Sequence, residues 1–163
     1  MKAILIINAQ NDFVEAYPEG QAIAEIIGDY LLDNANANVE IFSVQDTHYE
    51  LPTEFKLPYP IIGSFGHDIT PEVSLALYDT RNTYNGIHYV MKTKPCALEA
   101  INLMKAFHFD EVIIMGFGKA DLFLTAWGIK EVFPHMKINF VSRAITFDLP
   151  IEKLKNEGWG VIE

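Results

Sequence analysis

The sequence is short of cysteine and of basic residues, and both shortages exclude classes of protein. Among its 163 residues Cys96 is the single cysteine, so no internal disulfide can form and nothing points to an oxidising compartment. We therefore expect a cytoplasmic protein. Lysine and arginine total 12 against 22 aspartate and glutamate, a formal net charge of −10. A field of that sign repels nucleic-acid backbones and anionic membranes, so neither is an expected partner.

Long hydrophobic runs are also missing. The first apolar run, residues 3–7, is far too short to span a bilayer and lacks the small-residue cleavage site of a signal peptide. We expect it to form a buried first strand. Half of the residues are hydrophobic and 21% are charged, which is typical of a compact protein and too apolar for disorder. The length suits one domain over residues 1–163.

Strand-length apolar runs alternate with helical patterns along the chain. Strands are expected at 3–7, 39–44, 87–91, 112–115, 138–141 and 159–162. Helices are expected around 23–31, 98–105, 121 or 122 to 133 and 150–156, with a short candidate at 71–78. Such alternation indicates parallel strands with right-handed crossovers, and continuously apolar strands indicate helices on both faces. The predicted fold class is α/β, a three-layer α/β/α sandwich around a doubly wound, mainly parallel sheet.

In an open parallel sheet, ligands bind beyond the carboxyl ends of the strands, where the strand order reverses. The residues that follow the predicted strands include Asn8, Asp46, Lys92 and the turn 116–121. We therefore expect Asn8, Lys92 and Asp121 to face a common crevice. The proline- and glycine-rich segment 46–84 borders the same edge, and irregular segments of that length are usually functional.

Four motifs stand at these strand ends: LIINAQNDF, FSVQDTH, YVMK and GFGKADLFLTA. In this order, and over nearly the whole chain, they resemble the isochorismatase-like cysteine hydrolases, the superfamily that includes nicotinamidases. The resemblance implies a Rossmann-like α/β fold, a homo-oligomer that associates through helices flanking the sheet, and an aspartate–lysine–cysteine triad. In that triad the aspartate takes the thiol proton, the lysine favours the thiolate, and the thiolate attacks an amide carbonyl to form a thioester that water releases.

The triad positions fall on Asn8, Lys92 and Asp121, and only the lysine matches the family's pattern. An amide cannot act as a general base, although it can still form hydrogen bonds. Aligning the turn on Gly116 rather than on the following helix would place Leu122 at the nucleophile position, and that residue is not a cysteine either. The altered turn also departs from the backbone that would form the family's oxyanion hole.

Each of these residues has a simpler interpretation as well. Asp121 at a helix start is suited to be an N-cap. Lys92 can be a surface lysine, and Lys94 takes its place if the register slips by two. Cys96 lies near a predicted helix start, where a lowered thiol pKa is possible, but a small packed residue is the simpler reading.

The resemblance also raises the question of a divalent metal, since nicotinamidase-like members bind one through an Asp-x-His pair. Asp46 and His48 match that pair, and Glu54 is a candidate third ligand for an ion such as zinc. Tyr59 stands where a further histidine is implied, and His67 can compensate only if the loop turns back. Without a metal, Asp46 and His48 would instead organise the loop by hydrogen bonding.

Phe13 and Phe117 are the candidate walls of a pocket for a flat small molecule, although aromatic residues more often pack in a core. The expected function is that of an isochorismatase/nicotinamidase-like hydrolase-fold protein that lacks thiol-dependent amidase activity, a pseudoenzyme with a small-molecule pocket. The alternative is an active hydrolase of a small amide or ester in which Asp121 and Lys92 perform altered chemistry.

Overall fold

The structure is a computed structural model that describes residues 1–50 and 58–163. Its strands are β1 (Lys2–Ile7), β2 (Val39–Asp46), β3 (Gly86–Lys92), β4 (Glu111–Gly116), β5 (Lys137–Ile145) and β6 (Gly160–Ile162). Its helices are α1 (Asn11–Ala16), α2 (Gly20–Asp33), α3 (Pro71–Thr80), α4 (Leu98–Met104), α5 (Lys119–Val132) and α6 (Ile151–Glu157), with a 3₁₀ turn η1 (Phe65–His67). All six predicted strands and all five predicted helices are present.

The strands form one sheet in the order β3-β2-β1-β4-β5-β6, and every neighbouring pair is parallel. The chain moves outward from β1 through β2 to β3, then returns to the other side of β1 to continue with β4. The strand order therefore reverses between β1 and β4, which is where a doubly wound sheet places its ligand crevice. The predicted parallel, doubly wound sheet is confirmed.

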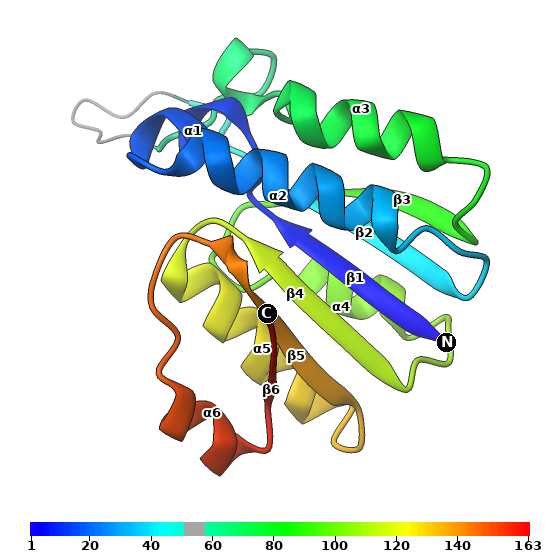
Figure 1. The fold of residues 1–163 in the computed structure, drawn as a ribbon. Coiled ribbons are helices and arrows are strands. Elements are labelled where there is room, and N and C mark those ends of the chain that lie inside the picture. The colour runs from blue at the N-terminus through cyan, green and yellow to red at the C-terminus, as the bar shows by residue number, and fades with distance from the viewer. Residues whose placement is uncertain (51–57) are drawn as a thin grey trace.

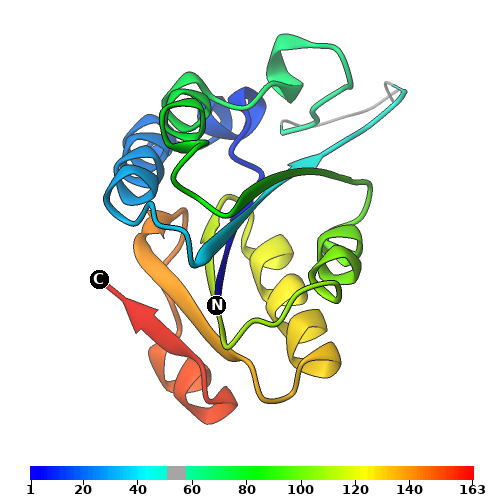
Figure 2. The ribbon, with the colours of Figure 1, turned by 90° about the vertical axis from the view of Figure 1, so that its right-hand side faces the viewer.

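Helices cover both faces of this sheet (Figures 1 and 2). In β1, Ile4 and Ile6 pack in the cluster shared with α2 and α3, whereas Leu5 and Ile7 pack in the cluster shared with α4 and α5. This alternation is the expected consequence of side chains pointing to opposite faces of a strand. Leu154 of α6 joins the second cluster. The three-layer α/β/α sandwich is confirmed.

Two local features differ from the sequence-based expectation. α5 begins at Lys119, before the predicted start at residue 121 or 122, because Gly118 adopts a positive φ of 87° and ends the turn there. The short helix α1 was not predicted, since six residues carry too little periodicity to be recognised.

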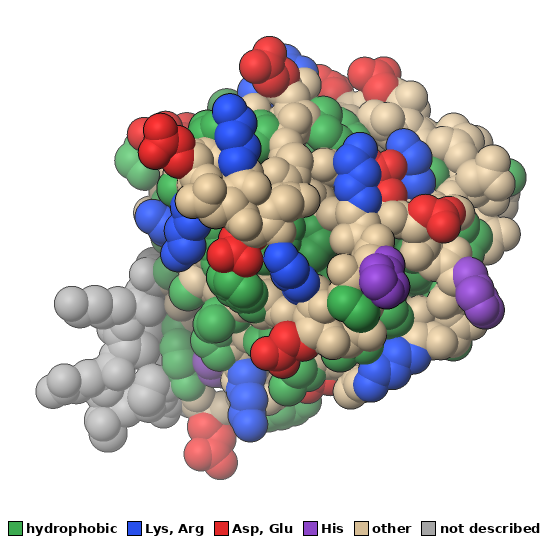
Figure 3. All heavy atoms as spheres, turned by 90° about the horizontal axis from the view of Figure 1, so that it is seen from below, with side chains coloured by type: hydrophobic (Ala, Val, Ile, Leu, Met, Phe, Trp, Pro, Cys, Tyr) green, Lys and Arg blue, Asp and Glu red, His purple; other side chains and the backbone are tan. Residues whose placement is uncertain are grey.

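Across the described ranges, no helix has the length and apolar character needed to cross a membrane. The face seen from below carries basic and acidic side chains interspersed, with no large area of one sign (Figure 3).

Candidate functional site

Asn8 follows β1 at the reversal point and is completely buried. Its φ of +56° is the left-handed conformation that asparagine tolerates better than most residues. The side-chain Nδ2 donates to the carbonyl oxygen of Phe117, at 3.2 Å, and to the carboxylate of Asp121. Both hydrogens of the amide are therefore used, which fixes its orientation, and Oδ1 is buried without a partner among the described residues.

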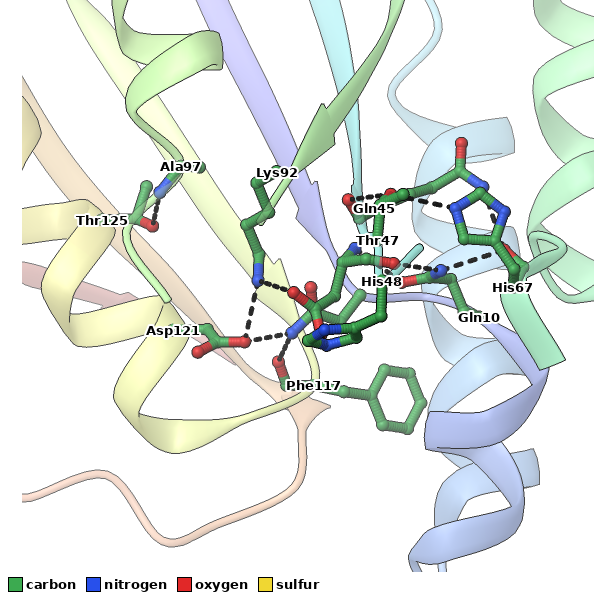
Figure 4. A network of polar contacts seen from close by, with 12 residues as sticks. Gln10, Gln45, Thr47, His48, His67, Lys92, Ala97, Phe117, Asp121 and Thr125 are labelled. Carbon is green, nitrogen blue, oxygen red and sulfur yellow. Dashed lines mark hydrogen bonds and ion pairs between the residues drawn. The ribbon is translucent and has the colours of Figure 1, made fainter. Parts of the chain in front are cut away.

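Lys92 ends β3, the strand on the far side of β2, and is 1% exposed. Its Nζ lies 3.1 Å from Asp46 Oδ1 and 3.1 Å from Asp121 Oδ2. Both carboxylates are largely buried, so the ammonium lies between two charges that water screens poorly. The surface interpretation of Lys92 is wrong. The structure brings Asn8 and Lys92 together on Asp121, whose Oδ2 accepts from both. Figure 4 shows the pair of Lys92 and Asp121.

Asp121 lies in the first turn of α5, but the N-cap of that helix is Gly118 and no side chain caps it. The N-cap interpretation of Asp121 is therefore wrong: its carboxylate points to Asn8 and Lys92 instead. The helix N-terminus still favours a negative charge at this position through its dipole. Leu122 is completely buried in the core, so the alternative alignment of the turn would put a core residue at the nucleophile position.

Gly116 allows the end of β4 to lie close against the end of β1, its parallel neighbour. Its φ is +123°, and a Cβ at this position would lie 2.0 Å from the carbonyl oxygen of Ile7. The turn that follows therefore runs directly against the end of β1, where Asn8 lies. This approach explains how the side chain of Asn8 reaches a residue 113 positions later in the chain.

Asp46 is the second carboxylate around Lys92. Its Oδ1 accepts from Lys92, and its Oδ2 lies 3.0 Å from Nε2 of His48. The ring of His48 stacks on that of Tyr59, with centroids 3.8 Å apart and planes 17° apart. With Lys92 protonated and both carboxylates ionised, Lys92, Asp46 and Asp121 carry a formal net charge of −1. A polar chain thus runs from Asn8 through Asp121, Lys92 and Asp46 to His48. Figure 4 labels Asp121, Lys92 and His48 of this chain.

Gln10 holds the β2 end of this chain in place, a role that the sequence analysis missed. It is completely buried, its Nε2 donates to the carbonyls of Asp46 and His67, and its Oε1 accepts from the backbone N–H of Asp46. The signal was available, since Gln10 opens the QNDF motif. A buried glutamine after a strand end needs partners, and here the partners are backbone groups of the site loop.

Of the candidate metal ligands, Asp46 and His48 lie next to each other. Both oxygens of Asp46 already have partners, one of them a cation, and Nε2 of His67 lies 2.9 Å from the hydroxyl of Thr47. Burial lowers the pKa of His67, which favours its neutral imidazole. Tyr59 supplies a stacking ring against His48, and Glu54 lies outside the described residues. Among the described residues no three metal-binding side chains group together, and a metal bound with the help of Glu54 stays a prediction.

Phe13 and Phe117 are 5% and 0% exposed and pack in the core under α1 and α2, with ring centroids 6.5 Å apart. The ring of Phe117 points away from Lys92 and Asp121 (Figure 4). Phe117 therefore does not fill the space between these two residues, which is instead bridged by their ion pair. A role of either ring in binding a ligand stays a prediction.

Cys96 is half-buried, and burial raises the pKa of its thiol. It packs on α5, where a Cβ added to Gly128 would lie 3.1 Å from its Sγ. A raised pKa leaves little thiolate at neutral pH, so this environment favours the packed role over the nucleophilic one.

The doubly wound parallel sheet between two layers of helices is the fold of isochorismatase-like hydrolases. The chain superposes with a TM-score of 0.73 on nicotinamidase PncA from Bacillus subtilis, at 16% identity and covering 99% of each chain. The TM-score is 0.71 for an isochorismatase-like hydrolase from Alkaliphilus metalliredigens, at 18% identity, covering 99% of this chain and 93% of that one.

A ribonuclease named MAR1 from Caenorhabditis elegans also shares the fold, with a TM-score of 0.66 and 13% identity over 97% of this chain and 74% of the other. No protein-family model matches the sequence, and the curated proteins gave no match. At these identities the likeness establishes the fold. The protein therefore has the isochorismatase-like hydrolase fold.

Proposed function

We propose that this protein is an isochorismatase/nicotinamidase-like member that lacks thiol-dependent amidase activity and keeps the site for binding a small molecule. The observation that carries the proposal is the carboxylate of Asp121, which is ion-paired with Lys92 and hydrogen-bonded by Asn8. The resemblance assigns the family's nucleophile to this position. Without a thiol at this position there is no thioester to form.

The two changed positions fit each other. In the family's triad, a thiol donates its proton to an aspartate. Here the direction is inverted, since Asn8 donates through Nδ2 and Asp121 accepts. Asparagine cannot take up a proton, and the lone pairs of Asp121 Oδ2 are engaged by Asn8 and Lys92. Asn8 Nδ2 and Asp121 Oδ2 are thus satisfied by each other and by Lys92, while Oδ1 of Asn8 has no partner among the described residues.

The proposal includes no metal, because the oxygens of Asp46 and the imidazole of His67 already bind other protein groups. It also includes no nucleic acid, although the neighbour from Caenorhabditis elegans is described as a ribonuclease. The net charge of −10 opposes binding to a phosphate backbone, and the face in Figure 3 mixes both signs. We place the protein in the cytoplasm, in keeping with its single cysteine.

An active hydrolase with altered chemistry is the second candidate, and one observation favours it. The side chain of Asp121 is 16% exposed, and its Oδ1 has no hydrogen-bond partner among the described residues. That oxygen could take a proton from water while Lys92 stabilises developing negative charge. In this case Asp121→Asn and Lys92→Ala would each abolish a hydrolysis that the wild type performs.

An amidase assay decides between the two candidates. Purified protein is incubated with nicotinamide and with a panel of small amides and esters, with the Bacillus subtilis nicotinamidase as the positive control. We expect no turnover by the wild-type protein, or by a folded Asp121→Asn variant. Hydrolysis by the wild type that Asp121→Asn abolishes would overturn the main proposal and establish the second one.

The pocket itself is tested separately by ligand binding. Nicotinamide and nicotinic acid are titrated into the wild-type protein. The NMR signals of the Asn8 side-chain amide and of the Lys92 side chain are followed during the titration. Shifts confined to Asn8 Nδ2 and its neighbours would support a retained pocket, and a spectrum unchanged at saturating ligand would contradict it for this ligand class.

A further inference from the structure

A cavity of about 770 Å³ lies at the amino ends of the strands, away from the strand ends that carry Asn8 and Lys92. The start of β1, marked N in Figure 1, is at this end of the sheet. A cavity of this volume accepts a small molecule. Lys2, which lines it, is about 20 Å from Asn8 at about 3.3 Å per residue along β1. The cavity is therefore a second place, distinct from the candidate site, where a ligand can bind.

The floor of the cavity is apolar. Ile4, Val39 and Ile113 are 1%, 3% and 4% exposed, and all three belong to the cluster packed under α2. They come from the neighbouring strands β1, β2 and β4, and Ile4 is the direct register partner of Ile113. Such a sheet surface suits the face of a planar ring, whereas it would leave the hydroxyl groups of a sugar without hydrogen bonds.

The charged groups at the cavity pair with each other. Lys2 Nζ lies 2.9 Å from Oε2 of Glu111, and Lys137 Nζ lies 3.5 Å from Oε1 of the same carboxylate. The ammonium group of Met1 lies 2.6 Å from the carboxylate of Asp110. Each charged group that lines the cavity in the described part of the chain thus has a counter-ion. A charged ligand would have to compete with these pairs, so a neutral ligand suits the cavity better.

Three polar groups on the α2 side of the cavity have no hydrogen-bond partner among the described residues. They are the hydroxyl of Tyr30, Oδ1 of Asn34 and the side-chain amide of Asn38. Nδ2 of Asn34 donates to the carbonyl of Tyr30 at 2.8 Å, which leaves its oxygen as an acceptor. Burial, and next the charge of Glu111, raise the pKa of Tyr30, so its hydroxyl stays a neutral donor. The wall therefore offers both donors and acceptors to a ligand.

We propose that this cavity binds a neutral planar heterocycle with donors and acceptors on its edge, the chemistry of the base of a nucleoside. The face of the ring lies on the apolar floor, and its edge meets the hydroxyl of Tyr30 and the amides of Asn34 and Asn38. An asparagine amide can pair with a base edge by donating to one atom and accepting from its neighbour. The inference is independent of the proposed function, because it uses no residue of the candidate site.

The first test is an NMR titration with adenosine, inosine, cytidine and uridine at millimolar concentration. The protein carries no N-terminal extension, because Met1 lines the cavity. We expect at least one nucleoside to shift the side-chain amide signals of Asn34 and Asn38 and the backbone signal of Ile4, while the signals of Asn8 stay unchanged. Ribose alone is the control and should shift none of them. The proposal is overturned if no nucleoside shifts these signals, if the shifts centre on Asn8, or if ribose reproduces them.

The second test uses variants that keep the fold. Tyr30→Phe removes a hydroxyl that has no partner among the described residues, so its loss should raise the dissociation constant of the bound nucleoside about two- to tenfold. Asn38→Leu keeps the side-chain size but removes the amide, and we expect a rise of at least about tenfold. The matched control is Asn156→Leu, at an exposed asparagine of α6 that does not line the cavity. Equal affinities of Asn38→Leu and Asn156→Leu would show that the amide does not read the base, which would refute the proposal.

Discussion

Asn8→Asp should destabilise the protein in a strongly pH-dependent way. The substitution places a second carboxylate within hydrogen-bond distance of Asp121, while Lys92 is already shared with Asp46. Two carboxylates about 3 Å apart repel by about 5 kcal/mol at an effective dielectric constant of about 20. Taking up one proton is less costly, because the protonated group can then donate to its neighbour.

The size of the effect follows from the cost of that proton. Keeping a carboxyl group protonated costs about 1.4 kcal/mol for each pH unit above its ordinary pKa of about 3.9, which gives about 4 kcal/mol at pH 7 and about 1.5 kcal/mol at pH 5. The stability of the variant falls as pH rises, because the pKa of its carboxyl group is raised in the folded state. The folded state then binds a proton that the unfolded state has released. The penalty is therefore absent below the unfolded pKa and grows as pH rises toward the folded pKa.

The assay is urea denaturation of wild type and variant at several pH values between 5 and 7. The difference in unfolding free energy should widen by about 1.4 kcal/mol per pH unit. Asn36→Asp, at an exposed asparagine, is the matched control and should show no such slope. The exchanged pair, Asn8→Asp with Asp121→Asn, again has one carboxylate and one amide and should recover most of the loss. A pH-independent difference, or an exchanged pair no more stable than Asn8→Asp alone, would refute the reasoning.

Three further predictions follow from the same structure. Lys92→Met leaves two largely buried carboxylates without their cation and should lower the free energy of unfolding by about 3 to 5 kcal/mol. Adding Asp121→Asn to this variant should restore part of the loss. Equal urea midpoints for wild type and Lys92→Met would contradict this prediction. Gly116 has a φ of +123°, and a Cβ there would clash with β1, so Gly116→Ala should prevent stable folding. Gly63 has a φ of +80° but lies in open space, so Gly63→Ala should lower the free energy of unfolding by only about 1 kcal/mol. Thermal melting measures both effects. Since burial raises the pKa of Cys96, its alkylation by iodoacetamide near neutral pH should be at least about tenfold slower in the folded than in the urea-unfolded protein, and equal rates would show an exposed thiol.

The fold could be predicted from the sequence because its strands are continuously apolar. Residues buried on both faces of a parallel sheet, such as Leu5 and Ile6 of β1, leave a signal that needs no tertiary information. The start of α5 could not be predicted, since it depends on the positive φ of Gly118. The short helix α1 was missed because six residues show too little periodicity to be recognised. Its Phe13 packs in the core, and the sequence pattern does not reveal that tertiary contact.

Part of the candidate site could also be predicted. The convergence of Asn8, Lys92 and Asp121 follows from the rule that parallel strand ends meet at one edge. The ion pair between Asp46 and Lys92 was not foreseen, because Asp46 was considered either as a metal ligand or as a residue that organises the loop, and only coordinates show that Lys92 lies 3.1 Å away. The bridging role of Gln10 depends on backbone carbonyls from distant segments, and sequence spacing does not reveal those.

The inverted hydrogen bond between Asn8 and Asp121 has an evolutionary consequence. A single mutation that restores aspartate at position 8 sets two carboxylates against each other, and one that restores cysteine at position 121 still leaves no base to activate it. Each one-step path back to thiol chemistry thus passes through a variant that is either less stable or still inactive. Under the proposed function, neither substitution alone would bring a gain in hydrolysis that selection could act on, so both would have to be acquired together.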